Sequence, residues 1–343
     1  MAKKNFRRIY RVAFGKPPDS VIIDDNRGIG FNVSKVQSPR GKSFDGTTIP
    51  LNAFSMSNVE GEEDYIGYQF KFSLESTRKM SKTGSGNEKT TLRLYNIEDD
   101  EVEKLNQNGA VVRVYAGYED TGLSLAYSGD IIRVVPAYEG EDTVYKITCK
   151  DGANDNKNAR ISIDYSDQMS DADIIKDLII RYPTADLAVA AVAEARNTYE
   201  PYGHSFQGFL ENNLNWFMEK FRLIYGWFNG KISIVPDSIS QSSEDFSVIK
   251  NNGYVLEADQ IKDIAYCSKS SNVTTNSKEL TRDIIVNTFY LPLDFATMIT
   301  IPYDKDNKII SQYMGSYVIV GNKTHLESYG KRWDVSIKAK AVG

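Results

Sequence analysis

The chain has 343 residues, enough for two or three domains with a substantial core and no need of stabilising cross-links. Its 41% hydrophobic and 25% charged content are ordinary for a globular protein. The formal net charge of −5, without a dense basic stripe, argues against tight nucleic-acid binding through phosphate neutralisation, although transient contact stays compatible. Cys149 and Cys267 lie in strand-like sequence without disulfide or metal-ligand spacing, which predicts two buried thiols in a reducing compartment.

Targeting signals are not evident. The basic start, Lys3-Lys4 and Arg7-Arg8, is not followed by the apolar stretch of a signal peptide. The longest apolar run, residues 187–193, is too short to span a bilayer. We therefore expect no export signal and an unused glycosylation sequon at Asn272-Val273-Thr274.

The first seventy residues predict three strands and one insertion. Residues 8–14 and 31–36 have strand-like composition. Residues 37–64 are polar and aperiodic, and we interpret them either as a partner-ordered insertion or as a surface loop. Residues 68–74 alternate between polar and apolar side chains, and the apolar face consists of Tyr68, Phe70, Phe72 and Leu74.

Residues 91–150 read as one complete unit. A strand over 91–95 is followed by a helix, for which Asn96 is the expected N-cap and Asp99 the expected capping-box partner. Asn108-Gly109 is expected to end that helix. An antiparallel meander follows, with strands predicted over 111–115, 123–135 and 144–149.

Two glycine-rich stretches resemble nucleotide-binding loops only superficially. In the segment 82–90 (KTGSGNEKT), Glu88 stands where a phosphate-binding loop needs glycine, and the segment leads into a strand and not a helix. Gly28-Ile29-Gly30 lacks the third glycine and the helix of a dinucleotide fingerprint. We interpret both as turns and expect no cofactor.

The middle of the chain predicts a small α+β domain. The turn-rich seam at 151–158 is the expected boundary. Ser170 and Asp173 predict a capped helix to Tyr182, and a second helix is expected from Ser205. The strands of a hairpin, 223–228 and 231–235, flank Asn229-Gly230, which favours a type I′ turn, and a serine-rich linker at 236–245 leads out.

The C-terminal segment repeats the pattern of the first unit. Strands are expected over 284–290 and 298–301, followed by two more in Gly315–Ile337. In that last stretch, as in Gly129–Ile147, a glycine opens a strand, a polar loop follows, and a second alternating strand ends the pattern. We interpret this as an internal duplication that places equivalent β-domains on both sides of the α+β insert.

No candidate site in the sequence predicts catalysis, cofactor binding or a metal. His204, expected at a helix start, and His325, expected in a turn, lack neighbouring ligands at metal spacing, so polar structural roles are favoured. Asp304 and Asp306 lack the glycine and terminal glutamate of a calcium loop. The acidic run Glu98–Glu101 fits the start of a helix. Tyr199 and Tyr202 suit either a carbohydrate-stacking or a protein-interface role.

Three segments together resemble the baseplate hub proteins of contractile phages, the group of the T4 central hub and the Mu- and P2-type tail hubs. They are LRLYNIEDDEVEKL with its following meander, FLENNLNWFMEKFRLIYGWFNGKISIVP, and GSYVIVGNKTHLESYGKRWDVSIKA. The resemblance runs from about residue 68 onward. The sequence departs from it at Asp294-Phe295-Ala296, where the family often has Pro-Gly, and in the insertion 37–64.

The resemblance implies a mainly β, α+β fold with two tube-like antiparallel β-barrel domains, residues 1–152 and 246–343, flanking a middle domain at 153–245. It implies a non-enzymatic homotrimer with pseudo-sixfold symmetry that joins a tail tube or adaptor ring to a central spike, next to tape-measure and wedge proteins, with DNA only in transit and no membrane insertion. The expected location is the virion, after assembly in the bacterial cytoplasm. The net negative charge would then suit a channel that repels phosphate. The alternatives are a distal-tail or adhesin subunit, or a hub that also cleaves peptidoglycan.

Overall fold

The computed structural model describes residues 7–16, 22–24, 34–36, 53–61, 64–67, 70–84, 88–239, 244–251, 253–267, 283–305 and 307–342. Most of the predicted insertion 37–64 lies outside these ranges, as do Gly28–Gly30, residues 85–87, the sequon 272–274 and Asp306. Among the described residues, no helix combines the length and apolar character needed to cross a bilayer.

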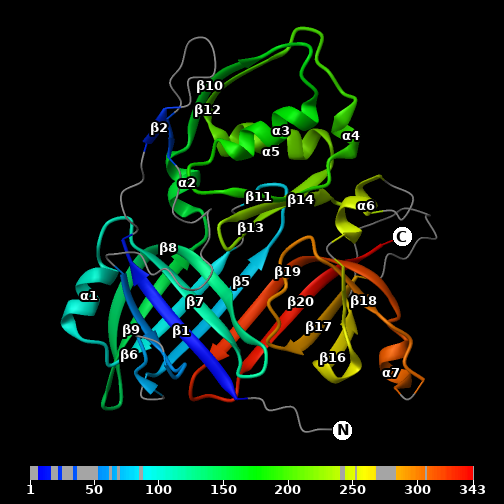
Figure 1. Cartoon of the computed structure of the whole chain (residues 1–343). Helices are drawn as coiled ribbons and strands as arrows, with labels where there is room; N and C mark the ends of the chain where they lie inside the picture. Colours follow the sequence, from blue (N-terminus) through cyan, green and yellow to red (C-terminus); the bar gives the residue numbers. More distant parts are fainter. Residues whose placement is uncertain are drawn as a thin grey trace.

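The chain divides into a strand-rich start, a mixed middle and a strand-rich end (Figure 1). The first part contains β1 (Arg8–Gly15), β2 (Ile22–Asp24), β3 (Ser34–Val36), β4 (Ala53–Ser57), β5 (Phe72–Lys79), β6 (Lys89–Tyr95), α1 (Asp99–Leu105), β7 (Val111–Tyr118), β8 (Gly122–Glu139) and β9 (Asp142–Lys150). The middle contains α2 (Ala153–Asn158), β10 (Arg160–Tyr165), α3 (Asp171–Ile180), β11 (Asp186–Ala190), α4 (Ala193–Arg196), β12 (His204–Phe209), α5 (Leu210–Lys220), β13 (Leu223–Phe228) and β14 (Lys231–Pro236). The last part contains α6 (Glu244–Lys250), β15 (Gly253–Val255), the 3₁₀ helix η3 (Ala258–Gln260), β16 (Ile261–Tyr266), β17 (Ile284–Phe289), β18 (Met298–Ile301), α7 (Lys308–Ser311), β19 (Gly315–Glu327) and β20 (Trp333–Ala341).

The fold is mainly β and is dominated by one large, mostly antiparallel sheet. Eleven of its 13 strands follow the order β16-β17-β20-β19-β5-β6-β9-β8-β7-β1-β4; off this path, β18 pairs with β19 and β15 pairs with β18. Among the described strands, β16 and β4 end the path without pairing with each other, so these strands do not close into a barrel. The expectation of two separate barrels is replaced, within one copy, by a single sheet that continues through both ends of the chain.

Ten strands of the sheet form two units with the same strand order, and β1, β4 and β15 lie outside them. In the first unit the order is β5-β6-β9-β8-β7, and in the second it is β16-β17-β20-β19-β18. The unit pattern agrees with the repeat seen in the sequence. The units meet where β5 pairs with β19, with Ser76 opposite Thr324.

The hydrogen bonds fix the correspondence between the units residue by residue. The N–H of Ile131 donates to the Ala110 carbonyl just before β7, and that of Ile319 donates to the Thr297 carbonyl just before β18, both at 3.0 Å. Both strands have a bulge directly after this isoleucine. Ile131 is therefore equivalent to Ile319, and the glycines that suggested the repeat, Gly129 and Gly315, are offset by two positions.

One apolar core serves both units. Trp333 of β20 is 1% exposed and packs near Tyr10, Phe72 and Tyr290, with ring centroids 6.3, 6.3 and 6.4 Å away. Tyr10 and Phe72 come from the first part of the chain and Tyr290 from the last. Because aromatic burial contributes strongly to stability, this shared cluster favours the two units folding as one body.

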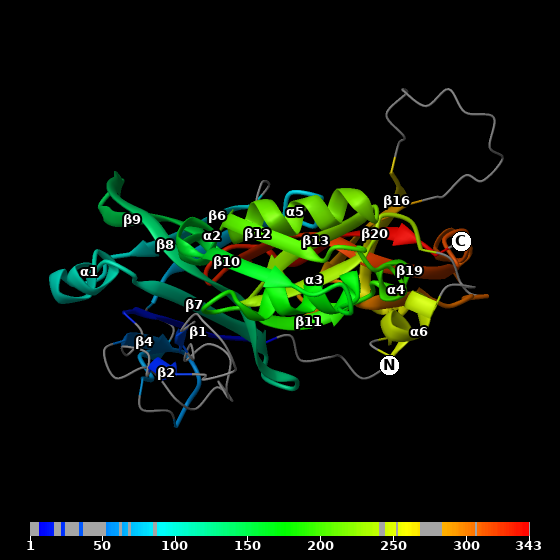
Figure 2. The same ribbon diagram turned by 90° about the horizontal axis from the view of Figure 1, so that it is seen from above.

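The middle of the chain forms a smaller layer above the sheet. Figure 2 shows α3 and α5 over the central region, with the first unit on one side and the second on the other. The helix α3 has the predicted Ser170 cap, whose side chain accepts from the Asp173 N–H, and its predicted apolar face is buried at Ile174, Ile175, Leu178 and Ile179. The β13–β14 hairpin has positive φ at both Asn229 and Gly230, as the type I′ prediction requires.

Two local predictions are wrong because distant contacts decide the conformation, and a third segment contains a helix that was not predicted. Asn96 has φ 52° and its side chain accepts from the Thr143 N–H, so Glu98 caps α1 and pairs with Glu101 in the capping box. The helix expected from Ser205 is strand β12 up to Phe209, paired with β10, and α5 begins only at Leu210. The polar seam after Asp151 contains the short helix α2.

Two strand predictions need smaller corrections. The strand expected over 68–74 begins at Phe72 and runs to Lys79. His325, expected in a turn, lies inside β19, opposite Asp334 of β20 on one side and Glu75 of β5 on the other.

Candidate functional site

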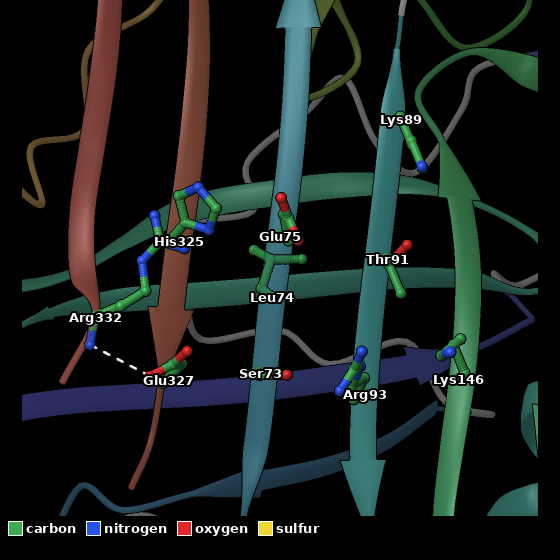
Figure 3. Close-up of a pocket in the computed structure, with 10 residues that line it drawn as sticks. All are labelled: Ser73, Leu74, Glu75, Lys89, Thr91, Arg93, Lys146, His325, Glu327 and Arg332. Carbon is green, nitrogen blue, oxygen red and sulfur yellow. Dashed lines mark hydrogen bonds between the residues drawn. The ribbon is translucent and has the colours of Figure 1, made fainter. Parts of the chain in front are cut away.

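A polar depression lies on the sheet where the two units meet. It extends across β19, β5, β6 and β9, has a volume of about 470 Å³, and is lined by Ser73, Leu74, Glu75, Lys89, Thr91, Arg93, Lys146, His325, Glu327 and Arg332 (Figure 3). Side chains alternate between the two faces of a strand, so these neighbouring strands present their polar residues together on the face away from the core.

The depression has more cationic than anionic side chains. Lys89, Arg93, Lys146 and Arg332 outnumber Glu75 and Glu327. Several cations are already paired: Arg93 contacts Glu139 at 3.2 Å, and Lys323, next to the depression, contacts Glu75 at 3.1 Å. Such exposed pairs contribute little to stability and are screened by salt.

His325 is the one histidine of the depression. Burial, together with the positive charges of Arg332 and Lys323, lowers the pKa of His325 below its usual 6.5. The hydrogen bond from Lys323 lowers the pKa of the Glu75 carboxyl, which lies opposite His325 in the sheet. The imidazole is therefore neutral near pH 7 and lies opposite the Glu75 carboxyl in the sheet.

A second polar cluster lies in the small domain. The Asp171 carboxylate is fully buried at the start of α3, and its Oδ1 lies 2.9 Å from His204 Nε2. Its Oδ2 accepts from Lys220 Nζ at 2.8 Å, and Lys220 also contacts Glu200 at 2.5 Å. The pairing of His204 with a carboxylate is the contact that sequence spacing missed, because the two residues are 33 positions apart.

The same cluster has the donor types of a metal site. Ligand atoms of Asp171, Glu200 and His204 lie within 4.8 Å of one another. Lys220, however, already supplies a positive charge to both carboxylates. Burial opposes its charged form, but the hydrogen bonds to Asp171 and Glu200 outweigh burial and raise the pKa of Lys220. The geometry favours an internal ion-pair cluster that joins α3, α5 and β12.

The other sequence candidates are not members of either cluster, although Tyr199 and Tyr202 flank Glu200 in the chain. Glu98 and Glu101 form the capping box of α1. Tyr199 and Tyr202 are 51% and 100% exposed near α4. Asp304 lies between β18 and α7, where its backbone contacts Ser311.

Within the two repeated units, two strand edges lack a partner among the described strands. The first half of β8 pairs with β7 up to Asp130, and Ile131 donates to the Ala110 carbonyl, but residues 133–139 pair only with β9 on their other side. At the far end of the sheet, β16 pairs only with β17. Open edges of this kind are templates for pairing with another chain. The only signal in the sequence was the apolar character of residues such as Tyr138, which is 82% exposed.

Comparison with known proteins gives a shared fold and no family assignment. No protein-family model matches the chain, and no curated protein matches its sequence. Among solved structures, a chain of the half-lidded Francisella PdpA–VgrG complex has 11% identity and a TM-score of 0.50, with 98% of this chain and 58% of that chain covered. The corresponding chain of the lidless complex has 10% identity and the same TM-score, with 98% and 65% covered.

The tail protein from Neisseria meningitidis MC58 aligns over 79% of this chain and 91% of its own, with 8% identity and a TM-score of 0.48. This chain thus shares the fold of a longer chain in the half-lidded PdpA–VgrG complex, and it spans 58% of that chain's length.

Proposed function

We propose that the chain is a structural hub of a bacteriophage tail, in which three copies form a pseudo-sixfold ring between the tail tube and a central spike. The single observation that carries the proposal is the pair of five-stranded units with identical order in one chain. Three such chains present six similar units, so one polypeptide can join sixfold and threefold partners. In the ring, each unit would serve as one tube-like domain.

The shared fold supports this proposal. The matching structure is named as a complex of VgrG with PdpA. From that fold similarity and the sequence resemblance to baseplate hubs, we infer that this chain binds spike and tube proteins in the virion. Assembly in the bacterial cytoplasm, contact with tape-measure and wedge proteins, a contractile tail and a central channel for DNA belong to the same proposal.

The charge of the channel depends on which face of the sheet lines it. A net charge of −5 suggested a lumen that repels phosphate. The depression of Figure 3, however, carries an excess of cations. A channel lined by this face of the sheet would attract the DNA backbone, so phosphate repulsion is not part of the proposal.

The test is the molar mass of the purified chain by size-exclusion chromatography with light scattering. A mass near three times 38.6 kDa, with an open-centred ring in images of that species, is the expected result. A monomer at every concentration would favour a different tail subunit, such as a distal-tail or adhesin protein.

We propose that the hub has no enzymatic role. The buried Asp171 carboxylate contacts His204 through one oxygen and Lys220 through the other, so it is held inside an internal ion-pair cluster. Digestion of purified peptidoglycan that disappears in His204→Ala would support the wall-cleaving alternative and contradict this part of the proposal.

A further inference from the structure

Within one chain, the two units meet through a pair of strands. Each strand of that pair has an equivalent in the other unit, and the two equivalent strands do not pair with each other within one chain. Inside the chain, β5 of the first unit pairs with the second half of β19 in the second unit. By the equivalence of Ile131 with Ile319, β19 corresponds to β8. By the same register, β5 corresponds to β16, with Ser76 equivalent to Tyr266.

The two counterpart strands both have open edges. The part of β19 that pairs with β5 corresponds to residues 133–139 of β8, which have no partner on that side among the described strands. The outer edge of β16 ends the described sheet. One open edge lies on the outer side of the first unit and the other on the outer side of the second unit. The two edges therefore cannot pair with each other within one copy.

The side chains at the counterpart positions are apolar and only partly covered. Leu74 and Leu326 face each other in the internal contact and are 2% and 0% exposed. Their counterparts are Ile264, which is half-buried, and Tyr138, which is 82% exposed. Burial of these two against each other would remove apolar surface from water, as it does in the internal contact.

We propose that β16 of one copy pairs antiparallel with residues 135–139 of β8 in a second copy, with Ala265 opposite Ala137. This inference rests on the proposed ring and names its interface. Because the two edges differ, the contact is head-to-tail, and repeated contacts close into a ring if the rotation per copy closes. In such a ring, the pairing of β16 with β8 joins the sheets of all copies into one continuous sheet.

The register makes a specific cross-link possible. The N–H of Glu327 donates to the Arg332 carbonyl, on the side of β19 that faces β20. Every second residue of a strand points its N–H to the same side, so the N–H of His325 also points to β20. Glu75 and His325 therefore form a non-hydrogen-bonded pair, the kind with Cα atoms about 4.5 Å apart, and Ala265 and Ala137 are their counterparts. That separation suits a disulfide.

The experiment uses the full chain with Cys267→Ser, Ala265→Cys and Ala137→Cys, oxidised mildly and analysed on a non-reducing gel. Cys149 is 1% exposed and stays in place. The expected result is covalent species of up to three copies. The matched control pairs Ala265→Cys with Val135→Cys, two residues out of register on the same strand, where diagonal neighbours are about 7–8 Å apart and the link should be much weaker.

Light scattering on the same samples separates the two hypotheses. A trimeric mass with the 265–137 link in excess of the control supports both. A trimeric mass without that link, or with equal linking in the control, overturns the proposed interface and leaves the ring. A monomeric mass without any link overturns the ring and the interface together. Unchanged melting temperatures verify that the cysteine variants are folded.

Discussion

The buried guanidinium of Arg78 donates a hydrogen bond of 2.9 Å from Nη1 to the side-chain oxygen of Asn229. Arg78 belongs to β5 in the sheet, and Asn229 forms the turn of the hairpin in the small domain. The guanidinium carbon also lies 4.0 Å from the centre of the Phe228 ring. Asn229 accepts in addition from the Ser128 N–H and donates to the Leu125 carbonyl. The hairpin turn is thus the joint between the two layers.

Replacing Asn229 tests this joint. Asn229→Ala removes its side-chain hydrogen bonds and places alanine at φ 56°, so we expect a loss of about 3 kcal/mol in the free energy of unfolding. Asn229→Gly loses the same bonds but tolerates positive φ, and should cost about 1–2 kcal/mol. Urea denaturation measures both. Two variants as stable as the parent would show that the joint contributes nothing.

The cluster around Asp171 predicts a strong effect at Lys220. Lys220→Met leaves the buried Asp171 carboxylate without its cation, and we expect a loss of about 3 kcal/mol at pH 7. The raised pKa of Lys220 means that its contribution is complete below the usual value of 10.5 and is lost as pH rises through the higher folded pKa. The difference in the free energy of unfolding between the parent protein and Lys220→Met should therefore decrease only at strongly alkaline pH.

The matched control for Lys220 is Lys176→Met. Lys176 pairs with Asp173 on α3, but both side chains are exposed and the contact is 3.4 Å. Exposed pairs contribute about 0.5 kcal/mol or less, so chemical denaturation should detect little change. Equal losses in the two variants would contradict a special role for the Asp171 cluster.

His325 predicts a loss of stability in mild acid. Its folded pKa is lower than the usual 6.5, so the unfolded chain binds the proton first as pH falls. Stability should decrease below about pH 6.5, by up to about 1.4 kcal/mol per pH unit. His325→Gln should flatten that slope, as measured by thermal unfolding from pH 7 to 5. The same slope in both proteins would assign the acid sensitivity to other groups.

Pro136 predicts a change in the assembly. It corresponds to Thr324, whose N–H points to β5, so the proline removes one donor from the outer edge of β8. Pro136→Ala restores that donor, and we expect the ring to dissociate at a concentration several-fold lower, as one added backbone hydrogen bond per contact implies. Light scattering on a dilution series measures this. Pro183→Ala, beyond the end of α3, is the control and should leave the dissociation unchanged.

Local patterns in the sequence determined much of the chain. Alternation predicted β6, β7, β8, β9 and the C-terminal strands, because a half-buried strand repeats every two residues wherever it lies. The Ser170 cap and the Asn229-Gly230 turn were also predicted, since each depends on contacts within a few residues. The same strands suggested the internal repeat.

The tertiary structure decided what depends on residues far apart in the chain. The side chain of Asn96 bonds across to Thr143, so the helix cap moved to Glu98, and pairing with β10 made His204–Phe209 a strand. Pairing of β5 with β19, about 250 positions apart, joined the two units in one sheet and placed the open edges at β8 and β16. The energy of such pairing comes from partners that no local window of sequence contains, which is why the repeat was visible in the sequence but its two open edges were not.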